Sequence, residues 1–153
     1  MLEKISKDFV IDHRTRHVEG LPPFSHSHQF NEIYFLQSGK CHVYIENEKY
    51  TLEDGSVLFI PAFKEHTFVY YDTVDVKRTV LYISTEQLNW YFDDNFKEEI
   101  DNLFINRYIK LSRKSFSNLS SLFEKIQFEK YNIDNLSAPL TKAYFFEMIS
   151  IFE

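Results

Sequence analysis

The sequence predicts a mainly β fold followed by a helical tail, with the change at Ser84. Before that residue, short segments rich in β-branched and aromatic residues alternate with turn signals, as in an antiparallel sandwich or barrel. After it, apolar residues repeat at helical spacing. The chain has 153 residues, of which 44% are hydrophobic and 18% aromatic. This composition supports a folded core and excludes intrinsic disorder.

Six segments of the first half have the length and composition of strands. They are residues 31–37, 41–46, 49–52, 56–62, 67–71 and 78–84. The sequence ENEK at 46–49 is typical of a hairpin connection between two of them. Because the strands are short and regularly spaced, we expect residues from about Phe9 to Ser84 to form an antiparallel jelly-roll barrel.

The second half is expected to be mainly helical from residue 85 to 153. Ser84 and Thr85 provide a capping signal for a first helix, and a second is expected over 96–104. Residues 108–112 are short and extended. A longer helix carries an apolar stripe from Phe116 to Ile126, and a last helix begins near Pro139.

The apolar stripes of the last two helices raise the question of what covers them. One barrel can cover only one side of a helix pair, and an exposed apolar stripe is unfavourable for a monomer. We therefore predict a homodimer, although a role in the chain's own core is an alternative for the same residues. The predicted dimer interface comprises Leu119, Leu122, Phe123 and Ile126.

Composition also excludes several functions and locations. The formal charge of −6, without a basic run, is unfavourable for direct nucleic-acid binding. The single cysteine, Cys41, excludes an internal disulfide and indicates a cytoplasmic chain. No signal peptide or membrane-spanning run is present in the sequence. The last helix reaches Glu153 without a stop signal, so we expect a longer protein.

Four polar residues of the first half have a pattern that suits a shared site. His26, His28 and Glu32 have the same parity, so an unbroken strand would point all three inward. His66 follows another strand and would lie opposite them. Three imidazoles and a carboxylate suit Zn, Mn, Fe or Ni. The alternative is a set of polar side chains that bond to one another or to water.

These residues resemble the two motifs of the cupin superfamily. Gly20, His26, His28, Glu32 and Gly39 match the first motif, G-x5-H-x-H-x3-E-x6-G, at every position. In the second motif, G-x5-P-x-G-x2-H-x3-N, the matching residues are Gly55, Pro61 and His66. That motif also has Phe63 in place of its second glycine and Tyr70 in place of its asparagine. The resemblance implies a cupin double-stranded β-helix, and Phe63 counts against a catalytic role.

With the helices included, the chain is similar to the N-terminal regulatory domain of AraC-type transcription factors. The similarity implies a cupin-like effector-binding barrel with an N-terminal arm over residues 1–84 and a dimerisation segment over 85–153. The DNA-binding domain would lie outside this chain, and DNA would be contacted only through it. The implied effector is a small molecule such as a sugar, and no metal is required. The expected pocket residues are His26, His28, Glu32, Tyr34, His66 and Phe68.

A small metal-dependent cupin enzyme, such as a dioxygenase or isomerase, is the second function class. It would use His26, His28, Glu32 and His66 as ligands of a divalent transition metal with one open coordination position. This reading leaves the long helical tail without a role. The regulator reading accounts for both halves of the chain.

Overall fold

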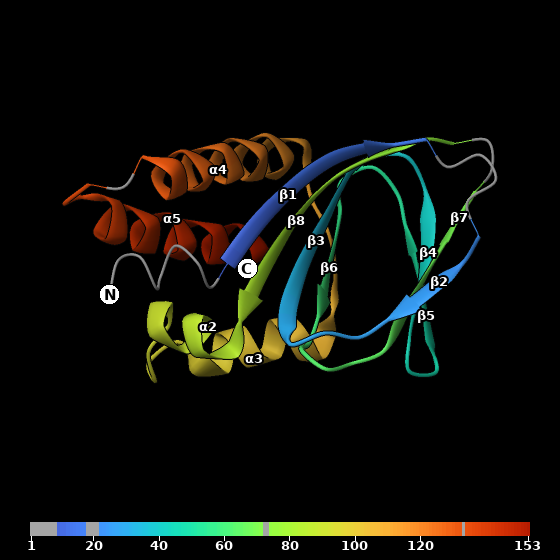
Figure 1. The fold of residues 1–153 in the computed structure, drawn as a ribbon, viewed down its shortest axis with the longest axis horizontal. Helices are drawn as coiled ribbons and strands as arrows, with labels where there is room; N and C mark the ends of the chain where they lie inside the picture. The colour runs from blue at the N-terminus through green and yellow to red at the C-terminus, as the bar shows by residue number, and fades with distance from the viewer. Residues whose placement is uncertain (1–8, 18–21, 72–73, 133) are drawn as a thin grey trace.

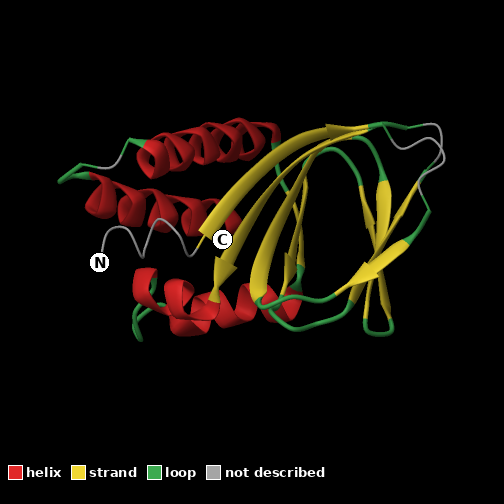
Figure 2. Ribbon diagram, viewed as in Figure 1, coloured by secondary structure: helices red, strands yellow, loops and turns green. Residues whose placement is uncertain are grey.

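Two antiparallel sheets and a group of helices on one side of them make up the computed structural model, which describes residues 9–17, 22–71, 74–132 and 134–153 (Figure 1). The first sheet has the order β1-β8-β3-β6-β9, and the second has the order β2-β7-β4-β5. Figure 2 shows the strands gathered in one half of the molecule and the helices in the other. The predicted fold class, a jelly-roll barrel followed by helices, is confirmed.

The strands of the two sheets have the following bounds. The first sheet comprises β1 (Phe9–Arg16), β8 (Val76–Ser84), β3 (Phe30–Ser38), β6 (Ser56–Ile60) and β9 (Tyr108–Lys110). The second comprises β2 (Phe24–His26), β7 (His66–Tyr70), β4 (Cys41–Ile45) and β5 (Glu48–Leu52). All described pairings are antiparallel. β1 was not among the strands predicted from the sequence.

The central strands of the first sheet are buried on both faces, because their two sets of alternating side chains enter two different cores. Tyr34, Leu36 and Leu58 point into the barrel between the sheets. Phe35 and Phe59, on the opposite face, pack against the helices. Since neither face meets water, β3 and β6 have nearly continuous buried runs and lack a polar alternate face.

Four helices follow in the described residues. They are α2 (Thr85–Tyr91), α3 (Lys97–Asn106), α4 (Arg113–Tyr131) and α5 (Ser137–Phe152). The predicted cap is confirmed, because the Ser84 side chain accepts a hydrogen bond from the Gln87 backbone N–H at 3.1 Å. α4 and α5 lie side by side against the outer face of the first sheet, and α2 and α3 lie near one end of its strands (Figure 1).

The predicted dimer interface requires a correction. Leu119, Leu122, Phe123 and Ile126 are at most 3% exposed and belong to the core that the helices share with the first sheet. In this fold their surface is already covered by the chain itself. The stripe was identified correctly as buried, but the sheet and α5 cover it, so these four residues offer no face to a second copy.

The predicted division at residue 84 coincides with a change of structure, because β8 ends at Ser84 and α2 begins at Thr85. Physically the two parts share one core, and β9 returns to pair with β6. The predicted N-terminal arm falls partly on residues 1–8 and 18–21, outside the described residues, while Phe9–Arg16 is strand β1. No helix in the described ranges is long and apolar enough to span a membrane.

Candidate functional site

The four residues singled out in the sequence come from both sheets. His26 ends β2 and is paired directly with His66, the first residue of β7. Glu32 belongs to β3 of the other sheet, and His28 lies in the connection between β2 and β3. The expectation of one unbroken strand is therefore wrong. The chain crosses from one sheet to the other between His26 and Phe30, and this crossing brings the histidines to face Glu32.

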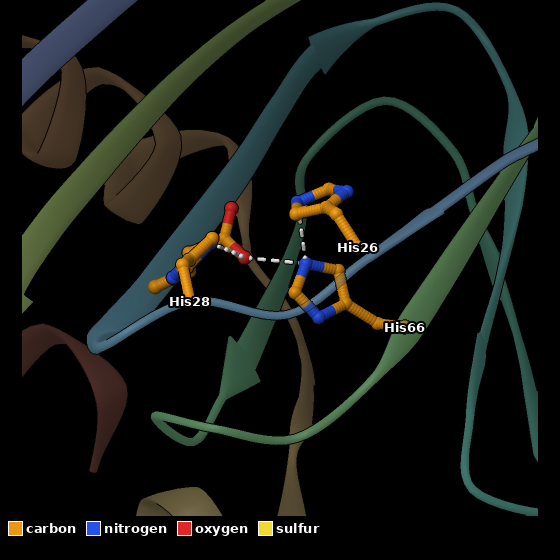
Figure 3. Close-up of side chains that lie close together, drawn as sticks. His26, His28 and His66 are labelled. Atoms are coloured by element: carbon orange, nitrogen blue, oxygen red, sulfur yellow. Dashed lines mark hydrogen bonds and ion pairs between the residues drawn. The ribbon is translucent and has the colours of Figure 1, made fainter.

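The side chains of this cluster meet in a small volume at one end of the barrel (Figure 3). One ligand atom from each of His26, His28, Glu32 and His66 lies within 4.8 Å of every other. Glu32 Oε2 is 2.8 Å from His66 Nε2 and 3.2 Å from His28 Nε2. His66 Nε2 is also 2.8 Å from His26 Nε2. The Glu32 and His66 side chains are almost fully buried, whereas the His28 side chain is 26% exposed.

The contacts of His66 place its Nε2 opposite a hydrogen-bond acceptor. Its Nδ1 lies 2.8 Å from the Lys64 carbonyl oxygen and must donate to it, because a carbonyl only accepts. A neutral His66 then has a bare lone pair on Nε2, which would face the Glu32 carboxylate at 2.8 Å. Two acceptors at that distance repel. Either an additional proton on the cluster or a bound metal ion removes the repulsion.

The electrostatics of Glu32 follow from the same geometry. Burial alone would raise the pKa of its carboxyl group, but the hydrogen bonds and charges of His28 and His66 outweigh burial and lower it to about 2. The bond to Glu32 raises the pKa of His28. Burial, followed by the nearby His66, lowers the pKa of His26. The carboxylate is therefore held in its charged form, which is the form that binds a cation.

Aromatic side chains surround the cluster. The Phe68 ring stacks on His26, with centroids 6.1 Å apart and planes 10° apart. Tyr34 contacts Phe68 at 5.1 Å but lies deeper, in the barrel core. Tyr82 was not predicted to be part of the site. It lies on β8, opposite Glu32 of β3, and its ring centroid is 5.8 Å from that of His28. Burial, with the Glu32 charge second, raises the pKa of Tyr82 to about 12, so Tyr82 is a neutral donor at the edge of the site.

A loop and one asparagine hold the cluster in place. The loop from Pro61 to Glu65 precedes His66, and its Ala62 N–H donates to Asn31 Oδ1 at 2.9 Å. The Phe63 N–H donates to the His28 carbonyl oxygen at 2.8 Å. Asn31 also donates to Ile83 and Thr85. Sequence reasoning missed Asn31, because a lone Asn at the start of a strand carries no distinctive pattern.

Phe63 occupies the motif position where glycine is usual, and its backbone is left-handed, with φ at 66°. A bulky residue is strained in that region, whereas glycine is not. The Phe63 side chain is 75% exposed, so packing does not explain its presence. A strained residue beside a polar cluster is a common mark of a functional site.

The donor set suits a divalent transition metal. Imidazole nitrogens and a carboxylate oxygen bind such ions at about 2.0–2.2 Å, so two ligands on opposite sides of an ion lie about 4.2 Å apart. The observed spread of 4.8 Å requires only small movements of the side chains. The bond from His66 Nδ1 to the Lys64 carbonyl directs Nε2 at the centre of the cluster, as a backbone carbonyl commonly does for a ligating histidine.

Comparison with known proteins agrees with this geometry. Residues 16–82 match the protein family described as Cupin domain. This chain contains a cupin domain. The matched residues include three strands of the first sheet and all of the second, together with His26, His28, Glu32 and His66.

One curated relative extends the similarity of the cupin domain into the helices. The HTH-type transcriptional activator RhaR of Mannheimia succiniciproducens is 25% identical over 146 residues, which are 95% of this chain and 51% of that protein. The chain thus spans about half the length of the curated relative it matches.

Among solved structures, a cupin protein from Bacteroides fragilis is 28% identical, with a TM-score of 0.41, over 50% of this chain and 64% of that one. A cupin-2 domain containing protein from Shewanella frigidimarina is 21% identical, with a TM-score of 0.41, over 48% and 69%. The DMSP lyase DddQ from Ruegeria pomeroyi is 21% identical, with a TM-score of 0.45, over 51% and 39%.

Proposed function

We propose that this chain is the ligand-sensing and dimerising part of an AraC-type transcriptional regulator. The observation that carries the proposal is the match to a transcriptional activator over 95% of the chain, helices included. The cupin domain accounts for residues 16–82 alone, and an activator gives the helical half a role as well. The regulator would act in the cytoplasm, and it would contact DNA through a domain outside residues 1–153.

The effector would bind at the polar cluster at the end of the barrel. His26, His28 and Glu32 offer hydrogen-bonding groups of both kinds, and His28 is open to solvent. Phe68 stacks on His26 and offers an aromatic wall. Hydroxyl-rich molecules with an apolar ring face, such as sugars, are bound by this combination. This role needs no metal. The Tyr34 ring packs against the Phe68 ring, with centroids 5.1 Å apart.

An effector controls such a regulator by linkage. A ligand that binds one arrangement of the loop at Phe63, of the N-terminal arm or of the dimer more tightly shifts the population toward that arrangement. The chain by itself carries a net charge of −6, so residues 1–153 should not bind a specific DNA sequence.

A thermal-shift screen over monosaccharides, with and without Zn, Mn, Fe and Ni salts, tests the proposal. Binding to the native state raises the melting temperature in a saturable manner. We expect at least one sugar to do so without metal, and His28→Gln to weaken the shift. His42→Gln is the matched control, because His42 lies on β4 and bonds to Thr51, away from the cluster. The proposal is contradicted if no small molecule raises the melting temperature of the metal-free protein in a saturable manner.

The metal-dependent enzyme remains the second candidate function, and the compact set of four ligand atoms favours it. Of the three side chains His28, Glu32 and His66, which pair with one another, His28 is the most exposed. A substrate would therefore approach a metal from the side of His28. Metal analysis of protein purified without a histidine tag separates the two candidates when it is combined with turnover assays. One equivalent of transition metal together with turnover of an organic substrate would favour the enzyme.

A further inference from the structure

A second cavity, of about 570 Å³, lies outside the barrel. Its lining residues come from α2, α3 and the adjoining ends of β3 and β6. Figure 1 shows α2 and α3 outside the two sheets. Leu88, Phe92 and Ile100 line it and are themselves buried, and Phe104 adds an aromatic ring. A cavity of this volume with an apolar floor has the size and character of a small-molecule site.

The charged residues of this cavity differ in sign from the chain as a whole. Lys97 and Arg107 line it, and Asp101 is the acidic residue among the described lining residues, so the lining carries a formal charge of +1. The whole chain carries −6. The Glu46 carboxylate, outside the lining, lies 3.8 Å from Arg107 Nη2 and offsets part of this charge. Basic groups beside apolar side chains favour a ligand with an apolar body and an anionic group.

Arg107 provides the more specific argument. Within the described residues its Nη1 is buried and has no hydrogen-bond partner, and its Nη2 is 3.8 Å from the half-exposed Glu46 carboxylate. A guanidinium has five N–H donors and is stabilised when a carboxylate or phosphate takes two of them. The buried Nη1 of the partly exposed Arg107 side chain is therefore unused, which is unfavourable for a polar group away from water.

The backbone of Arg107 is also unusual. Arg107 caps the C-terminus of α3 with φ at 65°, and its N–H bonds to the Leu103 carbonyl oxygen. Glycine is the common residue at such a position, because it adopts positive φ without strain. An arginine at a strained position, whose Nη1 has no hydrogen-bond partner within the described residues, indicates that the side chain has a role beyond the turn.

We propose that the cavity between α2 and α3 binds a small organic anion with an apolar body, such as an aryl or alkyl carboxylate, whose acid group pairs with Arg107. This site does not depend on the function proposed for the barrel. It adjoins the barrel site through Asn31, which lines the cavity and bonds to the loop that leads to His66.

The proposal is tested with 4-phenylbutyrate and its uncharged counterpart 4-phenylbutanol, added to residues 1–153 with labelled isoleucine and leucine methyl groups. We expect saturable shifts at Leu88, Ile100 and Ile105, which line the cavity. The acid should bind at least about tenfold more tightly than the alcohol, because a hydrogen bond to a charged group contributes that much. Arg107→Gln should abolish the preference, whereas Arg113→Gln, on the exposed start of α4, should retain it.

A second variant keeps the test decisive if Arg107→Gln fails to fold. Asn89 is exposed and lines the cavity, so Asn89→Trp should fill the entrance without disturbing the core. It should prevent binding of both the acid and the alcohol at an unchanged melting temperature. The proposal is overturned by unchanged binding to Asn89→Trp, by an acid preference that survives in folded Arg107→Gln, or by shifts confined to barrel residues such as Leu58 and Ile60.

Discussion

At the scale of single residues, Glu32 makes stability depend on pH. Its pKa is about 2 in the folded protein against an ordinary 4.5, so the folded state holds the carboxylate more strongly than the unfolded state. A depressed pKa contributes stability above pH 4.5, and that stability is lost as pH falls toward 2. His28 and His26 shift in opposite directions, so their effects near neutral pH partly cancel.

We therefore predict that the difference in unfolding free energy between wild type and Glu32→Gln shrinks in acid. In metal-free protein it should fall by on the order of 2–3 kcal/mol between pH 5 and pH 2.5, since one pKa unit corresponds to about 1.4 kcal/mol. Urea unfolding at several pH values, with chelator present, measures the difference. A difference that stays constant over this range would show that the histidines do not hold the carboxylate in its charged form.

Phe63 should be worse for stability than glycine. The left-handed backbone costs a non-glycine residue about 1–2 kcal/mol, which a glycine would not lose. Glycine has more freedom in the unfolded chain, and this offsets about 0.5–1 kcal/mol of that gain in stability. We predict that Phe63→Gly raises the unfolding free energy by up to about 1 kcal/mol, while it weakens effector binding. Phe63→Ala is the control: it removes the exposed ring and retains the strain, so its stability should match wild type. Equal stability of the Gly and Ala variants would refute the strain argument.

Among the residues outside the polar cluster, Asn31 is the one whose loss should disturb the site most. It is 6% exposed and makes three hydrogen bonds, to Ala62, Ile83 and Thr85. Asn31→Ala leaves the Ala62 N–H and the Ile83 carbonyl without these partners, so we expect a loss of about 2–3 kcal/mol in unfolding free energy. Asn89→Ala, at an exposed position on α2, should change it by less than about 0.5 kcal/mol. A small effect of Asn31→Ala in urea unfolding would mean that water replaces these bonds.

At the scale of elements, the sequence predicted strands best where both faces or one full face are buried. The run at 31–37 became β3, Phe30–Ser38, and the run at 56–62 became β6, Ser56–Ile60. Gly39 marked the end of β3 for a steric reason: its φ is 111°, and a Cβ there would lie 2.5 Å from the Asp75 carbonyl oxygen. Motif glycines are therefore informative about turns even in a single sequence.

The elements that were missed have weak local patterns. β1 has only two buried residues, Phe9 and Ile11, because it lies at the edge of its sheet, and its run after Ile11 is polar. The break between β2 and β3 is set by a crossing between sheets, which parity along one strand does not reveal. Residue types and spacing identified the four members of the polar cluster, but the crossing determines how they meet.

Helical stripes show which residues are buried, but they do not show what covers them. The stripe of α4 packs on the chain's own sheet, and the exposed face of α4 is polar along most of its length. Four exposed large apolar residues lie near the end of α4 and the start of α5. Phe128, Tyr131, Leu136 and Leu140 are 61%, 73%, 63% and 36% exposed. We call these four residues the α4–α5 patch.

At the scale of the whole molecule, the α4–α5 patch is where a second copy would bind. Four exposed apolar side chains near the connection between α4 and α5 are an unfavourable surface on a monomer, and a two-fold interface buries those of both copies at once. Each partly exposed side chain contributes on the order of 1 kcal/mol on burial, so eight contribute on the order of 8 kcal/mol. Association costs about 4 kcal/mol or more, so about 4 kcal/mol or less remains, and the dimer should be weak, with a dissociation constant on the order of 1 mM or above.

We predict that residues 1–153 form a concentration-dependent dimer in sedimentation equilibrium, and that Phe128→Glu together with Leu136→Glu makes the protein monomeric. The exposure of both side chains means that the variant should keep its fold, which the melting temperature checks. Ser121→Glu, on the exposed polar face of the same helix, adds a charge outside the patch and should still dimerise. A wild-type chain that stays monomeric at roughly 0.5 mM would remove dimerisation from the proposed function. A double variant that still dimerises would place the interface elsewhere.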